Sequence, residues 1–472
     1  MGDIEDHRLY LFKKSFWVMV GTVYMNLMSL LFWIVSSRFS TTEDVGYATT
    51  AFSLIMLISG TLTLGTQVAV LKYGSVDSKK SQIFSATIYI NLIISAIAVI
   101  ALILWGGRGL YGEEYRIYIM MAALFYPFMV FGNILSMALL GAMRSEIVTI
   151  IRVTTSTVKF GLAVLFAIIY SKITGLTIFI SASVPVVLGF IMSIPISMKI
   201  FEFTFKVERF WIVETLKIGL ANMPSRIFNI ILMNFGTVLL AFFTKNPSLV
   251  GVAYISLMIM FAISGLSGSF STMALPHSTA TDYRSYVDSL RYGLALTVIG
   301  AAVIAAAPKF ILSLINPEMA FAWKNLVLLM WALLIYVVIM NVITEWNAKS
   351  EYGKVSIIGI IMLVVLPLVL YISTSISKIS NISLGLALLT SLGFAFCYVL
   401  LSSSEKWFLR WFVEGSIIMG ASSVLGYYLT IKVHPVVGVI VSLVTSSVLI
   451  VFVFKVISFN EILDLLKGLF KK

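Results

Sequence analysis

The chain is a succession of long apolar runs, each close to the length that a helix needs to cross a bilayer, joined by short polar loops. A membrane-spanning helix takes roughly 20 mostly apolar residues, and on that template the sequence predicts about fourteen spans. The predicted spans are 16–37, 47–71, 83–105, 117–141, 147–170, 176–198, 218–243, 250–272, 290–306, 324–345, 355–373, 382–402, 411–429 and 435–454. The expected fold class is therefore an all-α polytopic membrane protein.

The balance of apolar and charged residues excludes a soluble globular protein. Hydrophobic residues make up 60% of the chain and charged residues 11%, whereas soluble proteins carry about 25% charged residues. The net charge of +12 would suggest nucleic acid as the partner of a soluble protein. In a membrane protein, loops that face an anionic cytoplasmic leaflet explain it better, so no nucleic-acid partner is expected.

The distribution of basic residues predicts the orientation of the chain. The two termini and every second loop hold most of the 33 lysine and arginine residues, and the other loops hold at most two each. Basic residues accumulate on the cytoplasmic side of a membrane. We therefore expect a multi-pass protein of the cytoplasmic membrane with both termini in the cytoplasm.

Two stretches of the chain begin with nearly the same residues and lead into equally apolar helices. Val45-Gly46-Tyr47-Ala48 leads to Ile58-Ser59-Gly60, and Val250-Gly251-Val252-Ala253 leads to Ile263-Ser264-Gly265. Such internal repeats indicate two helical bundles that rock about a site between them, as in transporters. We expect a first lobe over 1–205, a second lobe over 206–405, two further helices over 406–457 and an amphipathic cytoplasmic tail over 458–472.

Four basic residues fall inside predicted membrane segments instead of loops. Lys159 is about 20 Å of helix from the basic loop residue on either side, too far for its side chain to reach the headgroups. A cation near the bilayer centre costs about 2.5–3.5 kcal/mol, so Lys159 either lines an aqueous cavity or has a buried partner. Arg152 lies two turns nearer the cytoplasm on the same helix face, and either shares that cavity or extends to the interface.

The other two basic residues, Arg226 and Lys217, are near the start of the second lobe. Arg226 follows Pro224, which we expect to break the seventh span and to open backbone groups to the cavity. Lys217 either contributes to the cavity or belongs to an amphipathic stretch, 210–222, that suits the membrane interface.

The acidic residues are distributed differently from the basic ones. The predicted spans of the first lobe contain no carboxylate, whereas Glu345 ends the tenth span beside Asn341 and Asn347. Glu345 either couples transport to an ion or balances Lys349 at a cytoplasmic helix end. Amides within the spans, Asn26 among them, suit either a polar cavity or hydrogen bonds between helices.

No feature of the sequence indicates an enzyme, a metal site or a cofactor. The three histidines are far apart, and no zinc-protease, serine-hydrolase, phosphate-loop or dinucleotide-binding motif occurs in a usable context. The single cysteine, Cys397, excludes an intramolecular disulfide.

Three segments carry a family likeness. They are Arg38-Phe39-Ser40 through Asp44-Val45-Gly46-Tyr47, then Leu220-Ala221-Asn222-Met223-Pro224-Ser225, and finally Leu249-Val250-Gly251-Val252-Ala253. Together with the six-plus-eight arrangement of spans, they resemble the polysaccharide (Wzx-type) flippases of the multidrug/oligosaccharidyl-lipid/polysaccharide (MOP) exporter superfamily. The resemblance covers nearly the whole chain and implies two pseudo-symmetric six-helix lobes with two C-terminal helices.

The resemblance implies a transporter that moves a polyprenyl-linked oligosaccharide from the cytoplasmic to the outer leaflet by alternating access. Lys159, Arg152, Arg226 and Lys217 are then the candidate cations for its phosphate, and Glu345, Asn341 and Asn26 are candidates for ion coupling or a polar cavity. We expect a monomer in the bilayer, with glycan-assembly enzymes as the protein partners to consider. The alternatives are a multidrug and toxin extrusion (MATE) antiporter and a membrane glycan ligase.

Overall fold

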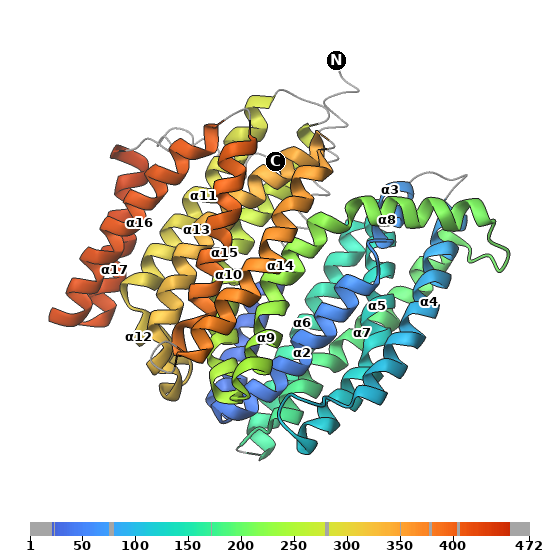
Figure 1. Ribbon diagram of the computed structural model, residues 1–472, viewed down its shortest axis with the longest axis horizontal. Coiled ribbons are helices and arrows are strands. Elements are labelled where there is room, and N and C mark those ends of the chain that lie inside the picture. Colours follow the sequence, from blue (N-terminus) through green and yellow to red (C-terminus); the bar gives the residue numbers. More distant parts are fainter. Residues whose placement is uncertain are drawn as a thin grey trace. The chain divides into compact units, whose positions relative to one another are not determined.

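The computed structural model describes residues 21–22, 24–74, 80–170, 172–278, 283–349, 351–376, 380–403 and 406–453. Helices dominate these residues, and no strand occurs among them (Figure 1). The predicted all-α class is therefore confirmed. The tail predicted over 458–472 lies outside the described residues.

The chain divides into two compact units, Met1–Ile255 with Val355–Ser377, and Ser256–Lys354 with Lys378–Lys472. The described part of the first unit includes a helical segment over 24–38 and most of α14 (Tyr352–Ser375). Its other elements are α2 (Thr42–Leu62), α3 (Gln67–Tyr73), α4 (Lys80–Trp105), η1 (Glu113–Tyr115), α5 (Arg116–Gly141), α6 (Ser145–Tyr170), α7 (Gly175–Phe201), α8 (Arg209–Ile230), η2 (Ile231–Phe235) and α9 (Gly236–Thr244). Helix α10 (Pro247–Ser278) begins in the first unit and ends in the second.

The second unit is also entirely helical over the residues that the structure describes. Its elements are α11 (Tyr283–Ala306), α12 (Pro308–Ile315), η3 (Pro317–Ala322), α13 (Trp323–Ala348), η4 (Ser380–Ile382), α15 (Ser383–Ser402), α16 (Trp407–Lys432), α17 (Pro435–Val448) and η5 (Leu449–Val453), while α14 (Tyr352–Ser375) packs in the first unit. Helices α16 and α17 pack against each other and both contact α11. The two C-terminal helices are thus an integral part of this unit.

Many of the described helices are long and apolar enough to cross a membrane. Ten candidate spans have the length and composition that a membrane crossing requires. Helices α11 and α12 make an eleventh if the pair is taken as one span bent by 84°. The shorter apolar stretch Pro435–Val451 adds to these. The chain is a multi-pass membrane protein.

The second predicted span, 47–71, is not one helix in the structure. Helix α2 ends at Leu62 and α3 begins at Gln67, because Leu64 and Gly65 both take left-handed backbone conformations (φ 49° and 69°). Gly65 lies directly against the backbone of Gly219 in α8, so a side chain at either position would collide with the other segment. The break lets the two chain segments approach more closely than intact helices with side chains would permit.

The expected break at Pro224 is wrong. Helix α8 continues through this position to Ile230, and the distortion comes later, as a single π-helical turn over Ile231–Phe235. A proline removes one backbone hydrogen bond, which a helix packed on several neighbours tolerates. Helix α8 has such neighbours in α2, α3 and α4.

The two repeated sequences meet in space within the first unit. Gly46, in the first turns of α2, lies against the Pro247 carbonyl of α10, and a side chain on Gly251 would come within 2.8 Å of the Gly46 nitrogen. Trp33 packs edge-on against Tyr254, with 5.0 Å between the ring centroids. The starts of α2 and α10 therefore cross with their backbones in contact, which only glycine permits.

Candidate functional site

Helix α6 places Lys159 among aromatic rings of the first unit. The Lys159 ammonium lies 4.5 Å from the ring centroid of Phe32, and 5.7 Å from those of Trp33 and Phe52. Phe32 and Trp33 belong to the helical segment 24–38 and Phe52 to α2, and all three are buried. Two elements, both distant from α6 in sequence, thus surround one cation with the negative faces of aromatic rings.

No carboxylate in the described part of the chain neutralises the charge of Lys159. Among the described residues, the Lys159 ammonium forms no ion pair and no hydrogen bond, and its polar contacts are those with the three rings. Cation–π contacts contribute about 2 kcal/mol when desolvated, which offsets only part of the cost of holding a charge inside a membrane. With respect to the described residues, the ammonium retains all three of its donors for an anion.

Helix α6 carries a second cation and two hydrogen bonds to the start of the chain's described part. Arg152, seven residues before Lys159, donates through Nη1 to the hydroxyl of Thr22 at 3.4 Å. The hydroxyls of Tyr24 and Thr157 form a hydrogen bond of 2.8 Å. Seven residues of helix span about 10 Å and bring both side chains to one face, so α6 presents a guanidinium and an ammonium on the same face, while Thr157, two residues before Lys159, projects from another face.

The other predicted cations of the first unit lie on α8, away from α6 in sequence. Lys217 is exposed. Arg226 belongs to α8, and its side chain is outside the described part of the chain. Asn26 is partly buried in the helical segment 24–38, which also carries Phe32 and Trp33. The four predicted cations therefore lie on two helices, Lys159 and Arg152 on α6 and Lys217 and Arg226 on α8.

Glu345 and Asn341 lie one helical turn apart on α13 in the second unit and are both buried. One carboxylate oxygen of Glu345 accepts a hydrogen bond from the Lys349 ammonium at 2.6 Å, and the other accepts from the Trp407 indole at 3.2 Å. Both oxygens of Glu345 therefore have donors, and the second of them joins α13 to α16.

Sequence reasoning did not identify the aromatic side chains around Lys159. Phe32, Trp33 and Phe52 stand in apolar runs, where large apolar residues face lipid or the protein core by default. Their sequence carries no sign of a cation contact, because the contact joins three separate elements. The only indirect signal was Lys159 itself, which required some stabilising environment.

Comparison with known proteins identifies the family. The family described as "Polysaccharide biosynthesis protein" matches residues 11–281, which is more than half of the chain. No curated protein sequence matches the chain.

Solved structures of transporters share the fold of the whole chain. The inward closed form of the lipid II flippase MurJ superposes with a TM-score of 0.70 at 15% identity, covering 92% of this chain and 98% of that one. An inward-facing MATE family multidrug transporter of the MOP superfamily gives 0.61 at 16% identity, covering 81% and 96%. A MOP superfamily transporter from Pyrococcus furiosus, described as having a binding pocket of reverse polarity, gives 0.59 at 16% identity, covering 87% and 96%.

The solved neighbours are described as a flippase and as transporters. The family match is independent of the fold comparison, and both confirm the resemblance deduced from the sequence. The chain belongs to the polysaccharide biosynthesis protein family and has the fold of the MOP superfamily transporters.

Proposed function

We propose that the protein flips a polyprenyl-linked oligosaccharide or polysaccharide repeat unit from the cytoplasmic to the outer leaflet. The observation that carries the proposal is the Lys159 ammonium, which has aromatic contacts but no counter-ion among the described residues. A fixed cation without a carboxylate, deep in a membrane protein, is suited to an anion that arrives with the substrate. The phosphate or pyrophosphate of a lipid-linked sugar is such an anion.

The two cations of α6 bind this headgroup in different ways. The ammonium of Lys159 pairs with the phosphate as a compact charge, and the Arg152 guanidinium, held by Thr22, adds a planar donor from a residue about 10 Å back along the helix. The hydroxyl of Thr22, which contacts Arg152, suits a sugar hydroxyl. The polyprenyl tail remains in lipid throughout.

The MATE-type antiporter is the main alternative, because several structural neighbours are MATE family transporters. Cationic drugs, protons and sodium ions need acidic side chains inside the spans. The acidic residues of the first 200 positions all fall in or beside loops, and Asp44 is engaged with Thr41 and the Gly175 amide. A basic interior favours an anionic substrate over a cationic one.

A membrane glycan ligase, the second alternative, requires a sizeable outer loop with catalytic side chains, and the loops of this chain are short. A coupling role for Glu345 is disfavoured as well, because both of its oxygens already have donors. We therefore assign substrate binding to Lys159 and Arg152, and leave Lys217, Arg226, Asn341 and Asn26 as secondary positions.

The direction of transport follows from the proposed orientation. Basic loops place both termini in the cytoplasm, so the lobes proposed over 1–205 and 206–405 open alternately to the cytoplasm and to the outside. The oligosaccharide enters from the cytoplasmic leaflet and leaves into the outer leaflet. Alternating access of two repeats about a central site is the general mechanism of transporters built this way.

The test is the leaflet location of a polyprenyl-linked oligosaccharide in proteoliposomes that contain only this protein. An impermeant glycosidase reports how much sugar is accessible over time. Loss of one partner of a buried charge pair costs about 2–5 kcal/mol, so Lys159→Ala should slow equilibration by a factor of about 30 or more. Lys159→Arg should retain part of the activity.

Lys172→Ala is the matched control, because Lys172 is an exposed lysine just after the same helix. A folded Lys159→Ala protein that flips at the wild-type rate would exclude Lys159 from the binding site. If the wild type moves no lipid-linked sugar but takes up a cationic dye against an ion gradient, the protein is a drug antiporter.

A further inference from the structure

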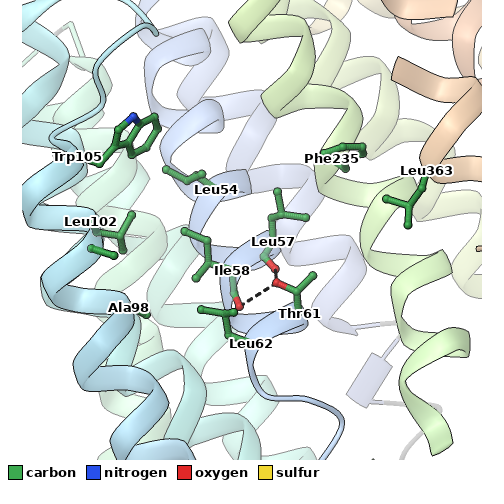
Figure 2. Close-up of a pocket in the computed structure, with 11 residues that line it drawn as sticks. Leu54, Leu57, Ile58, Thr61, Leu62, Ala98, Leu102, Trp105, Phe235 and Leu363 are labelled. Carbon is green, nitrogen blue, oxygen red and sulfur yellow. Dashed lines mark hydrogen bonds between the residues drawn. The ribbon is translucent and has the colours of Figure 1, made fainter. Parts of the chain in front are cut away.

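A large apolar pocket opens on the first unit, on helices that cross the membrane. Its volume is about 610 Å³, well within the range of ligand-binding pockets. Figure 2 shows side chains of α2 in its centre, of α4 on one side and of η2 and α14 on the other. Its walls include Leu57 and Ile58 of α2, Leu102 and Trp105 of α4, Phe235 of η2 and Leu363 of α14.

Water is a poor occupant of this pocket. Thr61 is one of its few polar side chains, and its hydroxyl already donates within α2, to the Leu57 carbonyl at 2.8 Å (Figure 2). The Trp105 indole donates to the Arg108 carbonyl at 3.1 Å. A buried water needs several polar partners, and these two side chains have their donors engaged, so the wall supplies little more than the acceptor side of the Thr61 hydroxyl. A hydrocarbon chain is the occupant that such a wall accommodates.

Two arginines lie where α4 ends, beside the rim formed by Trp105. The chain turns back after Trp105 through Gly106 and Gly107, which have left-handed backbones (φ 59° and 79°), and this turn brings the Arg108 carbonyl to the Trp105 indole. Arg116, at the start of α5, passes close to the same turn, with its Nε 3.8 Å from the position of a β-carbon on Gly106. Both arginines are exposed, and within the described residues neither has an ion pair.

We propose that this pocket and the two arginines form a binding site for an anionic phospholipid of the bilayer. One acyl chain fills the pocket against α2 and α4, and the phosphate lies at Arg108 and Arg116. Guanidinium groups bind phosphate oxygens through paired N–H donors, and tryptophan is common at the level of the headgroups. In the proposed orientation, the end of α4 is in the outer leaflet.

The spacing of residues on α2 distinguishes this site from the proposed substrate site. Leu54, Leu57, Ile58 and Thr61 form one stripe of the helix, whereas Phe52, which contacts Lys159, falls on the opposite face. The pocket is thus separated from the Lys159 ammonium by the body of α2. A bilayer lipid, which is abundant around these helices, is therefore the better occupant than the tail of a scarce substrate.

Binding of a lipid here would favour one arrangement of the first unit. The pocket combines α2 and α4 with η2 and α14, which follow much later in the chain, and η2 is a π-helical turn. Turns of this kind are often found at functional sites. A lipid that binds only when these elements surround the pocket stabilises that arrangement by its own binding free energy.

The test uses phosphatidylglycerol that carries a photoactivatable group in its acyl chain, in nanodiscs of phosphatidylcholine with the full-length protein. Cross-links should map to 54–62 and 98–105 and should be competed by unlabelled phosphatidylglycerol. Ala101→Trp places a large side chain in the pocket wall and should lower labelling severalfold, while Leu104→Trp, on an exposed residue of α4 that is not in the wall, should not.

The headgroup contact is tested by Arg108→Gln and Arg116→Gln. Each arginine near an anionic lipid contributes about a fivefold preference, so the double variant should label phosphatidylglycerol and phosphatidylcholine almost equally. Arg144→Gln, an exposed arginine in the turn between α5 and α6, should preserve the preference.

Three results would overturn the proposal. Undiminished labelling of Ala101→Trp would show that the chain does not occupy the pocket. An equal preference for the two headgroups in the wild type would exclude the arginine contact. Competition by polyprenyl phosphate at low mole fraction, without competition by phosphatidylglycerol, would assign the pocket to the substrate tail.

Discussion

At the scale of single residues, the contact between Lys159 and Phe32 should contribute measurably to the stability of the first unit. We expect a double-mutant cycle of Lys159→Met and Phe32→Leu to give a coupling free energy of about 0.5–2 kcal/mol, the range for exposed to desolvated cation–π pairs. The same cycle with Phe52, whose ring is 5.7 Å away and not 4.5 Å, should give a smaller value. The measurement is reversible unfolding in detergent micelles.

A coupling of zero for Phe32 would mean that the ammonium is turned away from the ring in solution, so the substrate assignment would lose its structural basis. Ile150→Leu, on an exposed position of α6, serves as the control, and it should not couple to either ring.

The sequence predicted the position of Lys159 for a simple energetic reason and could not predict its neighbours. A lysine so far from both ends of its span has few tolerable environments, and this holds whatever the tertiary structure. Phe32, Trp33 and Phe52 are typical of apolar helices, and their roles depend on how three elements pack. The partner of Glu345, in contrast, could be predicted from the sequence, because Lys349 lies four residues later on α13 and this spacing permits an ion pair.

At the scale of elements, the crossing of α2 and α10 should depend on glycine at position 46. A β-carbon there would overlap the Pro247 carbonyl and lie 2.8 Å from the Pro247 α-carbon. Gly46→Ala should therefore lower the free energy of unfolding by about 1–3 kcal/mol, as overpacked cores do. The melting temperature in detergent measures the effect.

Gly393→Ala is the matched control, since a β-carbon at this helical position of α15 would meet no atom within 4 Å. That substitution should be neutral or stabilising by up to about 1 kcal/mol, because alanine is the better helix former. Equal melting temperatures for the two variants would indicate that the helices separate at the crossing.

Hydropathy predicted the apolar segments well and their irregularities poorly. The stretch 60–67 is less apolar than the residues before it but contains no charge, so hydropathy left it within one span, and the break between α2 and α3 accompanies the packing of Gly65 against Gly219. At Pro224 the sequence predicts a break that the structure does not have, since this proline, which weakens isolated helices, lies within continuous α8. Local propensity competes with tertiary packing at both positions, and packing decides the outcome.

At the scale of the whole molecule, the repeated sequences and the apolar runs were sufficient to predict the superfamily fold. The repeats did not predict how the chain divides into two compact units. Helix α14 comes after several helices of the second unit along the chain, yet it packs in the first. Contacts between residues far apart in the sequence determine where α14 packs, and hydropathy does not predict such contacts.

The energetics of transport can be tested at this same scale. The proposed substrate is an anion that moves outward, so an inside-negative potential favours its transfer by about 2.3 kcal/mol per charge at 100 mV. For one net charge that crosses the whole potential, the outer-to-inner ratio in proteoliposomes should rise about fiftyfold. A potassium diffusion potential set by valinomycin, without sodium or proton gradients, isolates this contribution, and an impermeant glycosidase measures the ratio. A ratio that stays at unity under the potential, but rises when a sodium gradient is imposed, would replace potential-driven transport with ion antiport.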